Sequence, residues 1–115
     1  MMKIEALIQP FKLDEVTAAL EAIGIEEFTI LDVLKRGGRG ARKAVYRGAE
    51  YRVATPMLKL EILAPQELAQ EVVKVFSTTA RTNHWADDGT ILMYELRDAM
   101  RIRTGASLEY ALPSS

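Results

Sequence analysis

The feature that most constrains the fold is a succession of hydrophobic patterns that occurs twice along the chain. Apolar and polar residues first alternate, as in a half-buried strand, apolar residues then recur at helical spacing, and a further strand-like run follows. Each half therefore predicts a strand, a helix and a second strand, in residues 2–9, 14–23 and 28–34 and again in residues 57–63, 65–76 and 90–95.

Two strand–helix–strand units in one chain predict an α+β sandwich of the ferredoxin-like βαββαβ type. The length of 115 residues suits one core, so residues 1–115 are expected to form a single domain. Residues 101–104 are expected to add a short last strand, after a turn or short helix at residues 96–100. The helices cover only one face of the sheet, and the apolar residues expected on the other face predict self-association.

The segment between the two units, residues 36–55, lacks sustained apolar periodicity and holds four glycines and six arginine or lysine residues. A loop of this length in a compact domain is generally functional. The glycines that begin at Gly37 suit an anion-binding backbone nest, although they lack the P-loop pattern, and a flexible linker is the alternative. Tyr46 and Tyr51 are candidates for partner contact or covalent modification, with ordinary loop packing as the alternative.

Composition excludes several classes of function. The chain has no cysteine, which rules out disulfides, thiolate catalysis and cysteine-ligated metals. Its net charge of −1 provides no basic field for nucleic acid, and no aromatic residue interleaves with the arginines at residues 36–40. No apolar run approaches the length of a membrane span, and the first residues do not resemble a secretory signal. A cytoplasmic protein that is not inserted in a membrane is expected.

Two further patterns are candidate sites. His84, the only histidine, lies in a polar loop with Asp87 and Asp88, but spacing supplies neither an orienting partner nor a nucleophile, so no catalytic or metal-ligating residue is assigned. Arg101 and Arg103 would share one face of the expected last strand, with Ile102 pointing into the core. Two adjacent guanidinium groups suit phosphate oxygens, and a charged, aggregation-resistant strand edge is the alternative.

Three motifs together resemble the PII signal-transduction family, and the resemblance spans nearly the whole chain. Pro-Phe-Lys-Leu-Asp at residues 10–14 is similar to the corner between the family's first strand and helix. Tyr-Arg-Gly-Ala-Glu-Tyr at residues 46–51 is similar to the signature of its long partner-binding loop, the T-loop, here residues 36–55. Arg-Ile-Arg-Thr-Gly at residues 101–105 matches its closing motif, which precedes a C-terminal tail, residues 105–115.

The resemblance implies a homotrimer that binds adenine nucleotide in the clefts between subunits. The residues implied around the nucleotide are Ile8, Thr29, Glu61 and Leu63 at the adenine and ribose, Gly37, Asp88, Gly89 and Thr90 near the phosphates, and Arg101 and Arg103 as cationic clamps. The T-loop residues Tyr46, Arg47 and Tyr51 would contact a partner, and Tyr51 occupies the place of a tyrosine that is modified in some members. The implied partners are the cytoplasmic face of a membrane transporter or a metabolic enzyme.

Departures from the family's pattern modify the expected ligands. Arg39 stands where a glutamine contributes to binding Mg²⁺ and 2-oxoglutarate, and Met57 replaces a lysine that pairs with the 2-oxoglutarate carboxylate. Thr90 replaces the phosphate-binding lysine. ADP or AMP is therefore expected to bind in preference to ATP, with little or no response to 2-oxoglutarate, and binding of Mg²⁺ is left open.

The leading hypothesis is a PII-like regulator in nitrogen and carbon metabolism, not an enzyme. One alternative is a PII-like sensor of bicarbonate or another small anion that controls carbon uptake or efflux, which the altered loop residues motivate. A second is a slow ATP hydrolase, because some members of the family hydrolyse ATP slowly, although no base and nucleophile pair supports it.

Overall fold

The structure is a computed structural model that describes residues 1–37, 42–82 and 88–108, without the side chains of residues 42–44, 51 and 52. Its elements in chain order are β1 (Met2–Ile8), the 3-10 helix η1 (Pro10–Lys12), α1 (Leu13–Ala22), β2 (Thr29–Lys35), β3 (Arg42–Tyr46), β4 (Ala49–Val53), β5 (Thr55–Ala64), α2 (Gln66–Thr79) and β6 (Gly89–Glu95). The strands and helices predicted from hydrophobic periodicity are all present, with ends that differ by a few residues.

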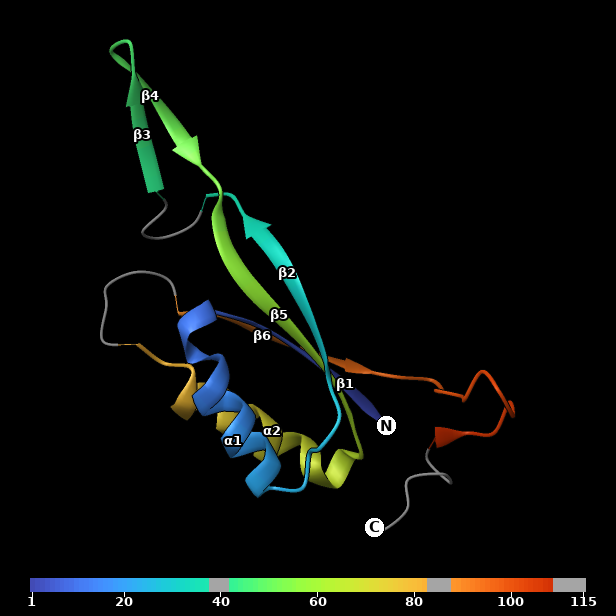
Figure 1. Cartoon of the computed structure of the whole chain (residues 1–115). Helices are drawn as coiled ribbons and strands as arrows, with labels where there is room; N and C mark the ends of the chain where they lie inside the picture. Colours follow the sequence, from blue (N-terminus) through green and yellow to red (C-terminus); the bar gives the residue numbers. More distant parts are fainter. Residues whose placement is uncertain (38–41, 83–87, 109–115) are drawn as a thin grey trace.

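Four of the strands form one antiparallel sheet in the order β2-β5-β1-β6. The two central strands come from different halves of the chain, which is the strand order of a ferredoxin-like fold. Both helices lie on the same face of this sheet (Figure 1). The predicted α+β ferredoxin-like architecture is therefore confirmed.

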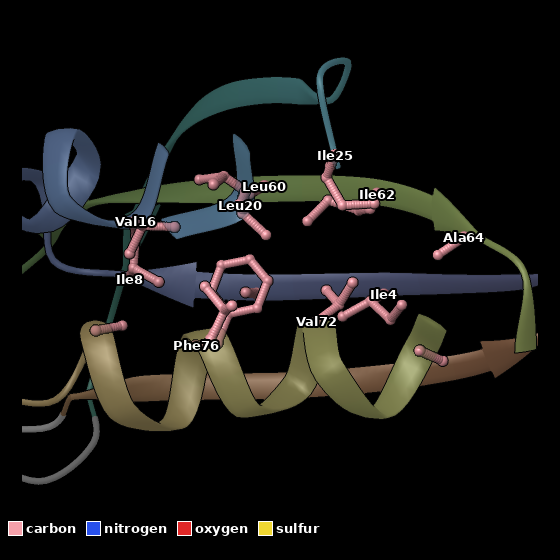
Figure 2. Close-up of a cluster of buried hydrophobic side chains, with 14 of the residues drawn as sticks. Ile4, Ile8, Val16, Leu20, Ile25, Leu60, Ile62, Ala64, Val72 and Phe76 are labelled. Atoms are coloured by element: carbon pink, nitrogen blue, oxygen red, sulfur yellow. The ribbon is translucent and has the colours of Figure 1, made fainter. Parts of the chain in front are cut away.

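The core lies between the sheet and the helices, and apolar alternation along the central strands builds it. Ile4, Ala6 and Ile8 of β1 are buried together, as their spacing predicts. Every second residue of β5 from Leu58 to Ala64 is buried beside them, and α1 and α2 add Leu20 and Phe76 (Figure 2). The alternation fixes which sheet face meets the helices and which face stays open.

A β-hairpin occupies much of the segment that was expected to be a loop. Strands β3 and β4 pair in antiparallel register, and the hairpin extends away from the sheet beyond the ends of β2 and β5 (Figure 1). Arg47 and Gly48 connect the strands, both at positive φ, 52° and 79°, as in a type I′ turn. The sequence pattern missed this hairpin because its described apolar side chains, such as Val45 and Tyr46, are exposed and so show no alternation between a buried and an open face.

The predicted last strand at residues 101–104 is wrong. This part of the chain turns back on itself, because the Gly105 N–H donates to the Arg101 carbonyl oxygen at 2.8 Å and Gly105 has φ +70°. Its only ladder contact within the described residues is a bridge between Met100 and Ser107. Ile102, expected in the core, is fully exposed at the tip of the turn. Residues 96–100 form no helix.

None of the helices in the described part of the chain is long and apolar enough to cross a membrane.

Candidate functional site

Eight of the ten predicted nucleotide-binding residues line two separate pockets. One pocket, here called the β6 pocket, has a volume of about 220 Å³, and the other, the β2 pocket, of about 310 Å³. The β6 pocket contains Ile8, Asp88, Gly89 and Thr90, and the β2 pocket contains Thr29, Glu61, Leu63 and Arg101.

The β6 pocket lies where the ends of β1 and β6 meet. Ile8 pairs with Gly89 in the sheet, which brings the two backbones together. Gly89 has φ +117°, and a Cβ added to it would overlap the carbonyl oxygen of Leu7. Only glycine permits this approach, so the pocket floor depends on the absence of a side chain at position 89.

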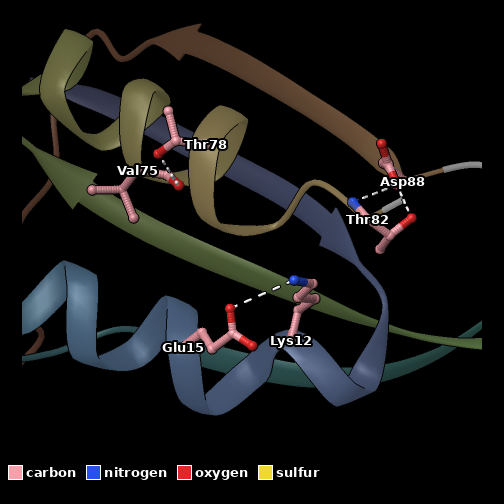
Figure 3. Close-up of polar contacts among 6 residues, drawn as sticks. All are labelled: Lys12, Glu15, Val75, Thr78, Thr82 and Asp88. Carbon is pink, nitrogen blue, oxygen red and sulfur yellow. Dashed lines mark hydrogen bonds and ion pairs between the residues drawn. The ribbon is translucent and has the colours of Figure 1, made fainter. Parts of the chain in front are cut away.

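Asp88 fixes the start of β6 to the chain that follows α2. Its carboxylate accepts a hydrogen bond from the Thr82 backbone N–H at 2.9 Å and another from the Thr82 hydroxyl (Figure 3). These bonds join the two ends of the connection between α2 and β6 at the rim of the β6 pocket. Asp88 therefore positions its neighbours in addition to lining the pocket.

The β2 pocket lies at the opposite edge of the sheet. Thr29 of β2 stands directly across from Glu61 of β5, and Phe28 and Leu63 provide apolar walls. Arg101 reaches this pocket because the turn holds it there, with its N–H donating to the Ala106 carbonyl oxygen at 3.0 Å. Met100 also lines the pocket, a role that sequence reasoning missed because it treated the residue as part of a connection.

The two pockets lie far apart within one chain. Thr29 belongs to β2 and Gly89 to β6, the two outer strands of the sheet, and β5 and β1 lie between them. With strands spaced about 4.8 Å apart, three spacings separate the edges by about 14 Å. Ile8, which was assigned to the same adenine environment as Thr29, lies in the other pocket of its own chain.

Two predicted nucleotide-binding residues line neither pocket. Gly37 lies just beyond β2 at φ +80°, and Arg103 is exposed in the turn after Met100. In the hairpin, Tyr46 is exposed and the Arg47 guanidinium lies 5.2 Å from the centre of its ring. Tyr51 lies in β4, but its side chain is outside the described part of the structure, as are Arg39 and His84.

The open face of the sheet carries a cluster of charges beside the β2 pocket. The Lys3 ammonium lies 3.0 Å from a Glu61 carboxylate oxygen and 3.2 Å from one of Glu5. Lys59 approaches the same Glu5 oxygen at 3.4 Å, and the Tyr94 hydroxyl donates to the other at 3.2 Å. This face, which was expected to carry apolar side chains, is mixed, with Leu7, Leu63 and Leu92 around the charges.

The cluster shifts the pKa values of two members. Partial burial by itself raises the pKa of Glu5, but hydrogen bonds from Lys3 and Lys59 outweigh it and hold that pKa below the ordinary value of 4.5. Hydrogen bonds to Glu61 and Glu5 raise the pKa of Lys3 above 10.5. The Lys3 contribution to stability is thus present below the unfolded pKa and lost as the pH rises through the folded pKa.

We expect Glu5→Gln to weaken the acid sensitivity of folding. Because the pKa of Glu5 is lowered in the folded chain, its stabilising effect is present above the unfolded pKa and lost as the pH falls through the folded pKa. The wild type should lose more stability than the variant between about pH 5 and about pH 3, measured by urea unfolding. Glu15→Gln, which removes a carboxylate from the surface of α1, is the control. If wild type and Glu5→Gln lost the same stability over this pH range, the lowered pKa of Glu5 would be contradicted.

The two pockets combine apolar and polar side chains. Each offers apolar walls, a threonine and one arginine, Arg81 in the β6 pocket and Arg101 in the β2 pocket. The β6 pocket has one carboxylate, Asp88, and the β2 pocket has two, Glu27 and Glu61. Within residues 1–37, 42–82 and 88–108, no group of three histidine, cysteine, aspartate or glutamate residues is placed to hold a metal ion.

Comparison with known proteins decides the family. A family model described as "Nitrogen regulatory protein P-II" matches residues 1–106. The chain belongs to the nitrogen regulatory protein P-II family. Proteins named nitrogen regulatory protein P-II from Haemophilus influenzae and Rhizobium etli are 43% and 42% identical to it over 113 residues, which cover 97% of this chain and 100% of each relative. Nitrogen regulatory protein P-II 1 of Escherichia coli K12 is 38% identical with the same coverage.

Membership confirms the resemblance on which the site residues were chosen. P-II proteins are regulatory proteins of signal transduction, so the chain belongs to a family of regulators rather than of enzymes. The identity extends along nearly the whole chain, and both pockets lie in the matched region, apart from Leu108 at the margin of the β2 pocket.

Proposed function

We propose that this P-II protein binds an adenine nucleotide between identical subunits and regulates a partner through its T-loop. The observation that carries the proposal is the division of the candidate site residues into two half-sites at opposite edges of one sheet. A ligand that needs both half-sites must bind where the β6 edge of one chain meets the β2 edge of another.

Such a contact joins two different surfaces of the same chain and is therefore heterologous. Heterologous contacts close into a ring when a whole number of rotations from one neighbour to the next makes a full turn. The ring proposed here is a homotrimer. The apolar residues around the charge cluster on the open sheet face, such as Leu63 and Leu92, would be covered in that assembly.

The half-sites offer complementary chemistry for a nucleotide. In the β2 pocket, Phe28 and Leu63 supply apolar surface suited to a purine, and Thr29 and Glu61 supply polar groups that suit its edge or the ribose. Arg101 at the rim of that pocket suits phosphate oxygens. In the β6 pocket, Thr90 and the backbone at Gly89 line the half-site that would hold the phosphates.

The T-loop is coupled to the β2 pocket through the strands that carry it. β2 bears Thr29 and leads into the T-loop, and β5 bears Glu61 and begins where the T-loop ends. If a nucleotide binds one arrangement of these strands more tightly than another, it shifts the population of T-loop conformations toward that arrangement. The exposed turn at Tyr46 and Arg47 is then the contact for a transporter's cytoplasmic face or a metabolic enzyme.

The ligand preference follows from residues 57 and 90. Met57 is buried, with 2% of its surface exposed, and offers no cation to a dicarboxylate such as 2-oxoglutarate. Thr90 lines the β6 pocket without charge. ADP or AMP is therefore proposed in preference to ATP, whose longer phosphate chain carries more negative charge to be neutralised.

We expect Thr90→Lys to increase ATP affinity about tenfold, with a smaller gain for AMP, because a charge-assisted hydrogen bond to phosphate adds about 1.5–3 kcal/mol. Isothermal titration of wild type and variant with ATP, ADP and AMP measures this. Thr90→Met, which matches the length but not the charge, should show no gain. Tight ATP binding by the wild type that strengthens further with 2-oxoglutarate would contradict the proposed preference.

A further inference from the structure

Arg81 lines the β6 pocket but is not among the site residues predicted from the sequence. It follows α2 and is exposed to solvent. Among the described residues that line the pocket, Arg81 is the one cationic side chain. It also has no carboxylate partner within the described part of the chain, so its guanidinium is available to an anion.

The backbone on either side of Arg81 is held in place. The Ala80 N–H donates to the Phe76 carbonyl oxygen at 3.0 Å, and Ala80 is buried against the core. On the other side, the Thr82 N–H donates to the Asp88 carboxylate at 2.9 Å, a contact visible in Figure 3. Arg81 therefore projects from a fixed point at the pocket rim, which reduces the entropy lost when it binds a ligand.

The surroundings of Arg81 make a cation necessary for any anionic ligand. The pocket includes the Asp88 carboxylate and the carboxyl-terminal end of α2, whose macrodipole is negative there. The last turn of α2 holds no basic residue, and Thr90 is neutral. Without Arg81, the charges that the described residues bring to this half-site would repel phosphate.

We propose that Arg81 binds the terminal phosphate of ADP held between two subunits. This inference rests on the proposed function and adds to it a specific phosphate contact. The second chain contributes Arg101 from its β2 pocket, so that one arginine from each subunit faces the diphosphate. AMP, with a single phosphate, gains less from the second arginine, and Arg81 is thereby a determinant of specificity for ADP over AMP.

The test is calorimetric titration of ADP and AMP into wild type, Arg81→Gln and Arg81→Lys. Arg81→Gln should weaken ADP binding about tenfold and AMP binding by less than about threefold, because the lost contact is a charge-assisted hydrogen bond. Arg81→Lys should restore part of the ADP affinity. Arg97→Gln is the matched control, since it removes an exposed arginine that lines neither pocket, and it should leave both affinities unchanged.

The ratio of the two affinities separates this role from a structural one. If Arg81 served only to compensate the α2 dipole, its loss would lower the unfolding temperature and leave the ADP to AMP ratio unchanged. An unchanged ratio in Arg81→Gln, with ADP still bound by wild type, overturns the role of Arg81 and leaves the proposed function intact. Absence of binding of both nucleotides by wild type overturns the proposed function and this inference together.

Discussion

Gly89→Ala is expected to destabilise the fold by about 3 kcal/mol or more and to lower the unfolding temperature by about 10 °C or more. Two costs add at this position. The backbone has φ +117°, which disfavours every residue with a side chain, and the added Cβ would overlap the Leu7 carbonyl oxygen. Relief requires β1 and β6 to move apart at their paired ends, next to the core residue Ile8. Thermal unfolding followed by circular dichroism measures the effect.

Gly24→Ala is the matched control. Gly24 also has a positive φ, which disfavours a side chain, but an added Cβ would overlap no other atom there. Gly24 has φ +91°, and a Cβ added there meets nothing within 4 Å. The free energy of unfolding should fall by only about 1 kcal/mol in the control, which is the ordinary cost of alanine at positive φ. Equal losses in the two variants would show that the approach of β1 to residue 89 does not constrain the sheet, and the structure of the β6 pocket would need revision.

Arg101→Ala is expected to weaken ADP binding about 10- to 100-fold without destabilising the chain. The side chain lies in an exposed turn and lines the β2 pocket, so its removal leaves no cavity in the core. The loss of affinity corresponds to about 1.5–3 kcal/mol for a hydrogen bond to a charged group. Calorimetric titration and thermal unfolding on the same preparation separate the two effects.

Arg97→Ala is the control for Arg101→Ala, because it removes another exposed arginine that lines neither pocket. It should bind ADP as the wild type does. If Arg101→Ala also retained wild-type affinity, the β2 pocket would not be a phosphate-binding half-site, and the turn at residues 101–105 would have another role.

The parts of the fold that the sequence predicts are those with a buried face. Ile4, Ala6 and Ile8 alternate because one side of β1 meets the helices, and the same constraint shapes α2 around Phe76. The ferredoxin-like strand order follows from the repeated strand–helix–strand pattern. Most of the candidate site residues were also predicted, by carrying positions over from the P-II family that the chain's motifs resemble.

Three other features of the structure were not predictable in the same way. The β3–β4 hairpin is held by its own ladder and turn, and Arg47 at positive φ gives no residue-type signal for that turn, unlike asparagine. The Arg-Ile-Arg alternation at residues 101–103 has the appearance of a strand, but no strand among the described residues pairs with it, and the chain turns instead. The close approach of Gly89 to Leu7 depends on two strands distant in sequence.

The division of the site between two subunits is tested most directly by mixing two defective chains. Arg101→Ala damages the β2 pocket, and Thr90→Glu places a negative charge in the β6 pocket, so each variant alone should bind ADP weakly at every site. When the two variants are refolded together in equal amounts, a site is intact if its β6 pocket comes from an Arg101→Ala chain and its β2 pocket from a Thr90→Glu chain. Each condition is met about half of the time, so about one quarter of the sites should regain wild-type affinity. No recovery by calorimetry, with wild type refolding to full binding capacity, would contradict a site formed between chains.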